Sequence, residues 1–313
     1  MNKLQTFTST GSKLLNHPLV VQKLKLTHFA IPISIQVAPE SRCNLNCSFC
    51  SNTRRNKHET LDIDELTHFL LRMRNIGAKT VEITGGGDPT QYYKINNLIT
   101  HCHSIMYKVG MITNGVQLRD KVTQHNLDKL AWLRISMNCL DYVGEVDLPR
   151  IQGTMGFSYV MNEKTDENVL NRLQEHVLQY KPAYVRIVPN CQSTYDEQEE
   201  NNKKYSKIIS EWGHPYFYQP KTFEQPKKCY WGYFKPFILH DGYVYYCSSI
   251  VLNDSAERKF HEKFRWCKME DLPEKYKSQV IPMIPSSCTH CVFSQQNNIV
   301  GGLLNPNGME DFV

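Results

Sequence analysis

Short apolar runs rich in β-branched residues alternate with amphipathic segments through the first two-thirds of the chain. The apolar runs predict strands at residues 33–37, 80–84, 108–112, 132–137, 156–161 and 184–188. Apolar residues at helical spacing predict helices at residues 61–76, 92–105, 119–130 and 167–180. This alternation predicts parallel strands joined by crossover helices, which is an α/β fold.

The alternation ends after the sixth predicted strand. A charged helix is predicted at residues 196–212, and the stretch 216–228, rich in proline, lysine and aromatic residues, is typical of a connecting segment. Two apolar runs, at residues 234–239 and 243–247, flank Asp241-Gly242. An Asp-Gly pair between two such runs is a strong signal for a β-hairpin.

The composition indicates a globular protein that is not exported. The chain has 313 residues, 41% of them apolar, which suffices for one large barrel or a barrel with a small appendage. Its apolar stretches are too short to cross a bilayer, and its N-terminus lacks the apolar core of a signal peptide. Eleven cysteines without an export signal indicate metal or thiol chemistry in a reducing compartment. We therefore expect a cytoplasmic protein with no membrane attachment.

Three cysteines stand at Cys-x3-Cys-x2-Cys spacing directly after the first predicted strand: Cys43, Cys47 and Cys50. Three thiolates from one loop can hold three irons of a 4Fe-4S cluster and leave the fourth iron open to a ligand that is not protein. A structural zinc site is the alternative, but it needs four ligands, and the nearest candidate for a fourth is His58. The spacing favours the cluster.

With Phe49 just before its last cysteine, this run resembles the signature of the radical S-adenosylmethionine (SAM) enzymes. The resemblance implies that the open iron binds the amino and carboxylate groups of SAM. One electron then cleaves SAM to methionine and a 5'-deoxyadenosyl radical. The resemblance also implies a partial (β/α)6 TIM-like barrel, with its active site at the carboxyl ends of the strands, and an electron donor such as flavodoxin or ferredoxin.

The same resemblance implies SAM contacts on the loops that follow the strands. A Gly-Gly-Gly-Asp-Pro run stands where the family has Gly-Gly-Glu-Pro, and its Asp88 is one methylene shorter than the usual Glu. The cofactor-binding residues expected from the family positions are Phe49, Gly86, Gly87, Asp88, Asn114, Ser136 and Asn138. Ordinary turns and packing are the alternatives, because glycine-rich and Asn-Gly sequences are common in turns.

A second set of four cysteines lies in the C-terminal third, at Cys229, Cys247, Cys288 and Cys291. Four thiolates can fully ligate a second 4Fe-4S cluster or a zinc ion. The set resembles the twitch domain, a short relative of the SPASM domain, and this resemblance implies an auxiliary cluster. The chain would then divide into an N-terminal extension (1–30), a radical SAM partial barrel (31–214) and a small α+β iron-sulfur domain (215–313).

The expected activity is removal of a hydrogen atom from an unactivated C–H bond of a peptide, nucleotide or small-molecule substrate. The basic loop with Arg54, Arg55 and Lys57 is a candidate contact for an anionic substrate, and a solvated charged surface is the alternative. Cys139 and Cys191 are candidate hydrogen donors or ordinary buried residues. A second class of function stays open: a nucleic-acid-binding module without catalysis, in which both cysteine sets hold structural zinc.

Overall fold

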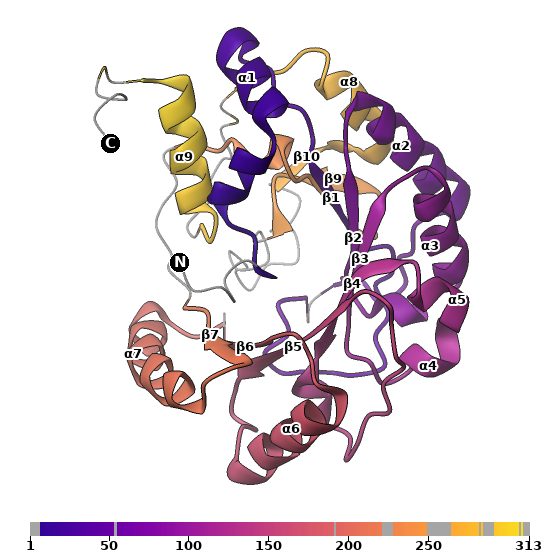
Figure 1. Ribbon diagram of the computed structural model, residues 1–313. Helices are drawn as coiled ribbons and strands as arrows, with labels where there is room; N and C mark the ends of the chain where they lie inside the picture. The colour runs from indigo at the N-terminus through magenta and orange to yellow at the C-terminus, as the bar shows by residue number, and fades with distance from the viewer. Residues whose placement is uncertain are drawn as a thin grey trace.

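The computed structural model describes residues 7–52, 55–190, 192–220, 228–248, 264–281, 283, 291–306 and 308. Ten strands of this part form one sheet in the order β10-β9-β8-β1-β2-β3-β4-β5-β6-β7. Helices cover its outer face, and the sheet curves around a central space (Figure 1). The predicted α/β class is confirmed.

The eight strands β8, β1, β2, β3, β4, β5, β6 and β7 follow one another in the sheet, and each runs parallel to its neighbour. Their bounds are β1 Ser34–Val37, β2 Thr80–Ile83, β3 Lys108–Thr113, β4 Leu130–Ser136, β5 Thr154–Met161, β6 Val185–Pro189, β7 Tyr216–Tyr218 and β8 Phe237–Ile238. Because parallel strands carry their carboxyl ends to the same edge, the loops after β1 to β6 gather there. All six strands predicted for the barrel are present near their expected bounds.

Four longer helices lie on the outer face: α2 Ile63–Ile76, α3 Ile95–Ser104, α6 Glu167–Tyr180 and α7 Tyr195–Trp212. The first of them shows why the sequence folds this way. The Asp62 side chain caps its start by accepting hydrogen bonds from the N–H groups of Asp64 and Glu65. Gly77 ends it with a φ of 131°, which glycine tolerates. Between these ends the buried residues are apolar and fall at helical spacing.

The prediction of one continuous helix at residues 119–130 is wrong. It is two short helices, α4 Leu118–Lys121 and α5 Gln124–Leu127. Val122 and Thr123 separate them with extended backbone, and the N–H of Thr123 donates to the Asn96 side chain at 3.0 Å. Two adjacent β-branched residues disfavour helix, and apolar periodicity alone does not register this break.

The C-terminal third extends the same sheet. β8 pairs with β1 and forms the predicted hairpin with β9 Tyr243–Tyr245, which in turn pairs with β10 Arg265–Lys268. Gly242 in the hairpin turn adopts a φ of 79°. The expected connecting segment begins with a strand, β7, which pairs with β6. The boundary at residue 215 therefore separates two stretches of one sheet, and the division into domains stays a prediction.

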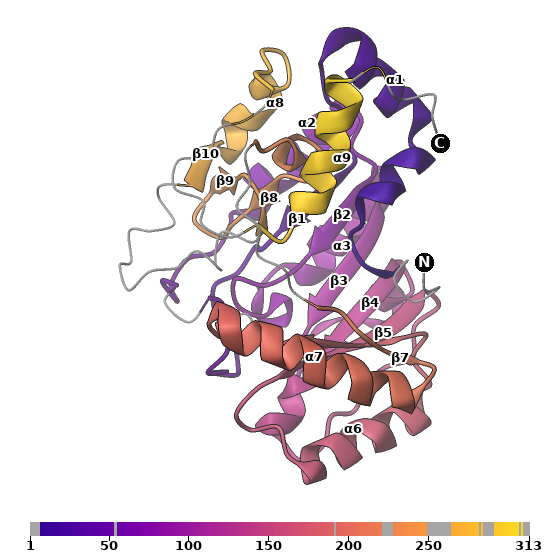
Figure 2. The same cartoon turned by 90° about the vertical axis from the view of Figure 1, so that its left-hand side faces the viewer.

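β7 and β10 are the edge strands of the sheet. The N-terminal segment and the last helix lie beside one another on this open side (Figure 2), as η2 Gly11–Asn16, α1 Pro18–Thr27 and α9 Ser294–Leu304. A hydrogen bond from Gln296 Nε2 to the Ser9 carbonyl, at 2.9 Å, joins them. Further short helices of the described part are η3 Pro89–Gln91, η4 Met137–Asp141, η5 Trp231–Tyr233, η8 Met269–Asp271 and α8 Leu272–Lys275.

The two faces of the sheet differ in polarity, because successive residues of a strand point to opposite sides. Ile35 and Val81 belong to the large apolar core and are almost fully buried. Gln36, Glu82 and Arg134 line the interior of the barrel instead. Within the described part of the chain, no helix has the length and apolar character needed to cross a bilayer.

Candidate active site

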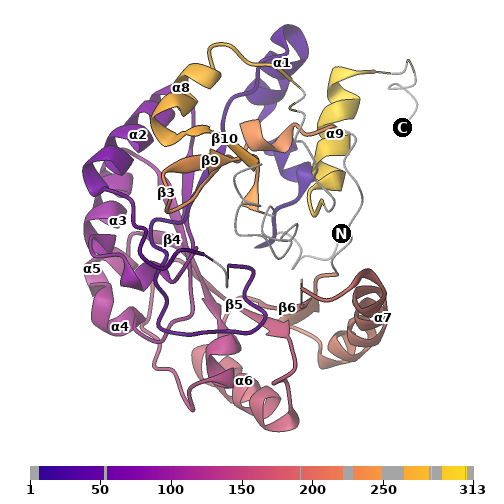
Figure 3. The ribbon, with the colours of Figure 1, turned by 180° about the vertical axis from the view of Figure 1, so that it is seen from behind.

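The loop after β1 carries the first cysteine set to the carboxyl edge of the sheet. Cys43, Cys47 and Cys50 are all partly exposed, and the connection from β1 to α2 lies in front of the strands in Figure 3. The N–H of Cys50 donates to the Cys47 carbonyl at 3.2 Å, so a turn keeps these two residues close. Phe49 lies in this turn and is also partly exposed.

The three thiols lie within electrostatic reach of one another. Burial raises the pKa of Cys47 to about 12, with further contributions from Cys50 and Cys43. Among the residues the structure describes, no three Cys, His, Asp or Glu side chains are grouped tightly enough to enclose a single metal ion. The donor set is three soft thiols on one partly exposed loop. Such a set fits a cluster of several irons with one accessible side.

Asn114, at the end of β3, reaches the first cysteine. Its Nδ2 lies 3.7 Å from Cys43 Sγ and donates to Asn44 Oδ1 at 2.7 Å. Its Oδ1 accepts from the N–H of Val116 at 3.0 Å, which fixes the orientation of the amide. The expected site residue Asn114 therefore connects the cysteine loop to the third strand.

The glycine loop after β2 packs against the start of the cysteine loop. The N–H of Gly87 donates to the Glu40 carbonyl, and that of Asp88 donates to the Arg42 carbonyl, both at 2.8 Å. A Cβ atom on Gly87 would lie 1.9 Å from the Arg42 oxygen. Only glycine allows this approach of two backbones. The close packing of the two loops therefore explains why position 87 is glycine.

Asp88 is buried, and its carboxylate oxygens accept hydrogen bonds from other groups of the protein. Oδ1 accepts from the N–H and the hydroxyl of Thr90, at 2.9 and 2.6 Å. The Thr113 hydroxyl lies 2.9 Å from both oxygens, and Oδ2 accepts from the N–H of Asn114 at 2.7 Å. This side chain, expected at SAM, ties the glycine loop to the end of β3.

Ser136 and Asn138 lie at the end of β4, on the expected edge. Asn138 is 1% exposed. Its amide donates to Asp141 Oδ2 and the Val160 carbonyl, both at 2.9 Å, and accepts from the N–H of Val160 at 2.7 Å. Asn138 therefore joins β5 to the end of β4, whereas Ser136 is more accessible.

Arg55, considered as a substrate contact, holds the cysteine loop. Its Nη1 lies 3.9 Å from Cys50 Sγ and donates to the Asn52 carbonyl at 2.6 Å, and its Nε donates to the carbonyl of Ser41. Lys57 is exposed, and Arg54 lies outside the described residues. The basic loop thus supports the cysteines through the one arginine that the structure describes.

His240, in the turn between β8 and β9, connects the C-terminal hairpin to the glycine loop. It is 4% exposed, and its Nδ1 lies 2.9 Å from Glu59 Oε2. A Cβ atom on Gly86 would lie 2.2 Å from its Cδ2. Its Nε2 is buried and bonds to no described residue. Burial lowers the pKa of His240, and Glu59 opposes this shift. A single histidine before a turn gives no sequence signal for such a role.

Cys139 and Tyr142 lie close to the cysteine loop. Cys139 is 1% exposed, and burial raises its pKa to about 12, which suits its reading as a small buried residue. Tyr142, which no sequence pattern singled out, accepts a hydrogen bond from the N–H of Ser48 at 3.2 Å. The other candidate hydrogen donor, Cys191, lies outside the described residues.

The described members of the second cysteine set are close to one another. Cys229 and Cys291 are buried, and Cys247 is partly exposed. Burial raises the pKa of Cys229, with contributions from Cys247 and then Cys291. Cys247 and Cys291 therefore lie within electrostatic reach of Cys229, and Cys288 lies outside the described residues.

Polar groups lie close to this second set. The backbone N–H groups of Gly232 and Trp231 oppose the rise in the pKa of Cys229, and Asn297 Nδ2 of α9 lies 3.7 Å from Cys291 Sγ. The Asn297 Oδ1 accepts from the N–H of Trp231 at 3.0 Å, which ties α9 to this region. N–H groups aimed at ligand sulfurs are typical of metal–thiolate sites.

Residues 39–137 match the family model described as the Radical SAM superfamily. This range contains the first cysteine set, the glycine loop and Asn114. The match supports a 4Fe-4S cluster and SAM as the cofactors of this part of the chain.

Two curated relatives share parts of the sequence. The S-adenosylmethionine-dependent nucleotide dehydratase RSAD2 of Oncorhynchus mykiss is 24% identical over 201 residues, which are 62% of this chain and 55% of that protein. A PqqA peptide cyclase of Bradyrhizobium diazoefficiens is 30% identical over 105 residues, which are 33% of this chain and 26% of the cyclase. The chain thus spans about half of the first relative's length and a quarter of the second's.

The fold has solved counterparts. Streptococcus suis SuiB, bound to its precursor peptide SuiA, superposes with a TM-score of 0.55 over 86% of this chain and 70% of that chain, at 16% identity. A likeness at this identity shows the fold. The expected partial TIM-like barrel with a small C-terminal addition is therefore confirmed.

Proposed function

We infer that this chain is an enzyme of the radical SAM superfamily that removes a hydrogen atom from an unactivated C–H bond. One observation carries the proposal. The partly exposed loop with Cys43, Cys47 and Cys50 lies at the carboxyl edge of the sheet, against the glycine loop after β2 and beside Asn114 after β3. Three separate strand ends thus converge where the barrel fold places its chemistry.

Cys43, Cys47 and Cys50 would hold a 4Fe-4S cluster whose open iron SAM completes. When bound, the reduced cluster supplies one electron that cleaves SAM and so creates the radical that takes hydrogen from the substrate. The electron would come from a donor protein such as flavodoxin or ferredoxin. Partial exposure of all three thiols supports access from solvent for both SAM and this donor.

The proposed SAM contacts fall into two groups. Residues that would touch SAM are Phe49, Gly86, Gly87, Asn114 and Ser136, and of these Phe49 and Ser136 have partly exposed side chains. Asp88 and Asn138 are positioning residues instead, because their polar atoms already bond to Thr113 and Val160 among others. They would hold the loops on which the SAM contacts lie.

The substrate would be a peptide, a nucleotide or another small molecule. The relatives' names support this range, since one is a nucleotide dehydratase, one a peptide cyclase, and SuiB was solved with a precursor peptide. The barrel interior offers a cavity of about 700 Å3. A space of this size suits a small molecule or a few residues of a peptide.

A second 4Fe-4S cluster is proposed at Cys229, Cys247, Cys288 and Cys291. The electrostatic contributions of Cys247 and Cys291 to the pKa of Cys229 support it, as does the Asn297 Nδ2 donor 3.7 Å from Cys291 Sγ. Zinc would use the same four ligands. With every iron ligated by protein, this cluster would transfer electrons or stabilise the fold and would not bind substrate.

The decisive experiment compares the triple variant Cys43→Ala/Cys47→Ala/Cys50→Ala with the wild type after anaerobic purification. We expect the variant to form no 5'-deoxyadenosine from SAM with dithionite, and its iron to fall from about eight to about four per chain. The matched control is Cys102→Ala, at a fully buried cysteine of α3, which should keep both properties.

Two results would contradict the proposal. Formation of 5'-deoxyadenosine by the triple variant would reject the cluster assignment. A colourless wild-type protein with stoichiometric zinc and no iron would favour the nucleic-acid-binding module instead.

A further inference from the structure

Nitrogen donors approach the sulfurs of the first cysteine set from several directions. The N–H of Leu45 donates to Cys43 Sγ at 3.4 Å, and Asn114 Nδ2 lies 3.7 Å from the same sulfur. Arg55 Nη1 lies 3.9 Å from Cys50 Sγ. Two sulfurs of the set therefore face side-chain donors, one neutral and one positively charged.

Side-chain donors of this kind occur, among the described residues, at the two cysteine sets and at no other cysteine. At the second set, Asn297 Nδ2 lies 3.7 Å from Cys291 Sγ. Cys102 and Cys139 are buried in the core, and no side-chain N–H of a described residue approaches their sulfurs. The donors thus accompany the sulfurs proposed as ligands, which is where such groups influence a metal–thiolate site.

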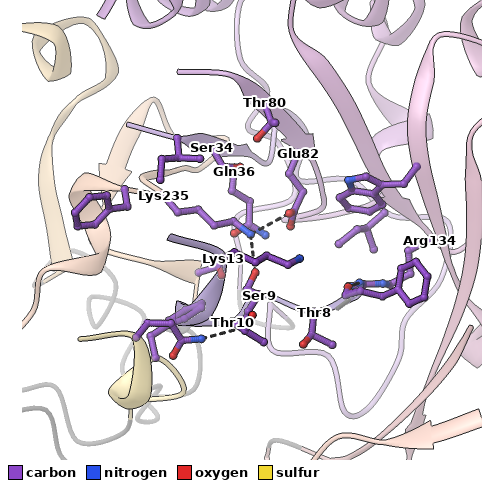
Figure 4. Close-up of a pocket in the computed structure, with 18 of the residues that line it drawn as sticks. Thr8, Ser9, Thr10, Lys13, Ser34, Gln36, Thr80, Glu82, Arg134 and Lys235 are labelled. Carbon is purple, nitrogen blue, oxygen red and sulfur yellow. Dashed lines mark hydrogen bonds and ion pairs between the residues drawn. The ribbon is translucent and has the colours of Figure 1, made fainter. Parts of the chain in front are cut away.

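Cations in the barrel interior face oxygen instead. Lys235 Nζ lies 2.9 Å from Glu82 Oε2, and Figure 4 shows both side chains inside the barrel. Arg134 Nη2 donates to the Phe7 carbonyl at 2.9 Å. Oxygen atoms are the usual acceptors for ammonium and guanidinium groups. Arg55 differs from these two cations, because its Nη1 also faces a sulfur.

The orientation of the Asn114 amide is fixed by the bonds around it. Its Oδ1 accepts from the N–H of Val116 at 3.0 Å, and its Nδ2 donates to Asn44 Oδ1 at 2.7 Å. Its backbone N–H donates to Asp88 Oδ2 at 2.7 Å. An amide nitrogen carries two protons, so Nδ2 has a second proton to offer to Cys43.

The position of the Arg55 guanidinium is fixed in a similar way. Nη1 donates to the Asn52 carbonyl at 2.6 Å, and Nε donates to the carbonyl of Ser41. A guanidinium group stays charged in proteins, so these bonds hold a permanent positive charge beside the loop. Burial raises the pKa of Cys43, and the N–H of Leu45 and the charge of Arg55 oppose this rise. The surroundings of the loop therefore favour negative charge on sulfur.

We propose that Asn114 and Arg55 set the reduction potential of the cluster on this loop, each by directing N–H groups at a ligand sulfur. The inference rests on the proposed function, in which a donor protein passes one electron to this cluster. The added electron increases the negative charge on the sulfurs, so N–H donors stabilise the reduced form more than the oxidised form and raise the potential. Both are positioning residues, because they act on SAM cleavage through the cluster.

The test is a redox titration of the anaerobically reconstituted full chain, followed by electron paramagnetic resonance. The signal of the first set is the one that the Cys43→Ala/Cys47→Ala/Cys50→Ala variant lacks. SAM is left out, so a lost SAM contact cannot contribute. Asn114→Leu keeps the side-chain size and removes both amide protons. We expect the equilibrium constant for cluster reduction to fall about tenfold, which is about 59 mV for one electron.

Asn114→Asp makes the test specific for charge. It places a carboxylate of the same shape beside the sulfur, so its potential should lie below that of Asn114→Leu. A merely loosened loop would not produce this order.

Arg55→Met is the second probe and should lower the potential by at least as much as Asn114→Leu, because it removes a charged donor. It keeps the inference testable if the Asn114 variants take up too little iron, and iron content and circular dichroism are compared first. Lys57→Met is the matched control. Lys57 is an exposed cation of the same loop, and screening by solvent and salt should leave the potential unchanged.

Three results would overturn the inference: an unchanged potential in iron-loaded Asn114→Leu and Arg55→Met, a potential of Asn114→Asp that is not below that of Asn114→Leu, or an equal shift in Lys57→Met and Arg55→Met. Formation of 5'-deoxyadenosine with excess dithionite, measured separately, tests the proposed function. A chain with the expected shifts that never cleaves SAM would keep this inference and reject that function. A chain that cleaves SAM with the same potential in every variant would do the reverse.

Discussion

The two cysteine sets differ in how the protein surrounds them. The first lies on one partly exposed loop, and side chains such as Asn114 and Arg55 approach its sulfurs. The second is assembled from segments far apart in the sequence, with Cys229 and Cys291 buried. An accessible loop suits a metal group that exchanges its outer ligand, whereas a buried assembly of distant segments suits one that stabilises the fold.

The same contrast has an energetic side. A metal group at the second set would close long loops of the unfolded chain, which is where a cross-link stabilises most. At the first set the cysteines are close in sequence, so a bound group removes little chain entropy. We therefore expect the first set to control chemistry and the second to control stability.

The two cysteine sets should differ most in how the protein responds when the cysteines of the second set are replaced. Cys229→Ala/Cys247→Ala/Cys291→Ala should lose about half of the iron and lower the free energy of unfolding by roughly 5 kcal/mol, or about 10 °C in melting temperature. Uncoupled SAM cleavage should persist. Iron analysis, calorimetry and 5'-deoxyadenosine assays measure these quantities in the same preparation.

The control for this comparison is the triple alanine variant of the first set, which should lose SAM cleavage with a much smaller change in melting temperature. If both variants were destabilised to a similar extent, the two cysteine sets would not differ in their contribution to stability. Stoichiometric zinc in the wild type, with about four irons in place of eight, would assign the second set to zinc.

Sequence reasoning succeeded where the signal is local. The spacing of the first cysteines, the glycine run and the Asp241-Gly242 hairpin each need only neighbouring residues, and they occur in the structure where expected. It failed where pairing is distant. β7, three residues long, is too short for a periodic signal. Only the sheet shows that β7 and the hairpin strand β8 pair with β6 and β1.

The site residues divide in the same way. The sequence predicted Asp88 as a site residue. Its hydrogen bonds from Thr90 and Thr113 depend on where η3 and the end of β3 meet, which the sequence does not show. The interior charges did leave a signal. Parallel strands covered on both faces are usually apolar throughout, so the polar residues at alternate positions of β2 and β4 indicate a polar interior.

His240 connects the C-terminal hairpin to the glycine loop, and its replacement should have a medium effect. His240→Ala would leave Glu59 without its 2.9 Å partner and open space beside Gly86. A less defined glycine loop should weaken SAM binding about tenfold, equivalent to about 1.4 kcal/mol, while the iron of both sets stays. Equilibrium binding of SAM to the reconstituted protein measures this.

Glu59→Gln is the matched variant, because its side chain still offers an oxygen to His240 and should therefore keep most of the SAM affinity. Unchanged SAM binding in His240→Ala would mean that the hairpin packs on the barrel without influencing the cofactor loop. The two cysteine regions would then act independently.

The smallest expected effect concerns Arg55 and sharpens the description of the first set. Arg55→Ala removes a donor 3.9 Å from Cys50 Sγ and a 2.6 Å bond to the Asn52 carbonyl. The iron of the first set should then be lost a few-fold faster to a chelator, because outer contacts orient the ligands of a metal group. Lys57→Ala, at an exposed residue, should change nothing, and the iron of the second set should be equally stable in all three proteins. If Arg55→Ala kept its iron and its uncoupled SAM cleavage but lost substrate turnover, Arg55 would be a substrate contact after all, and the loop would owe its order to other residues.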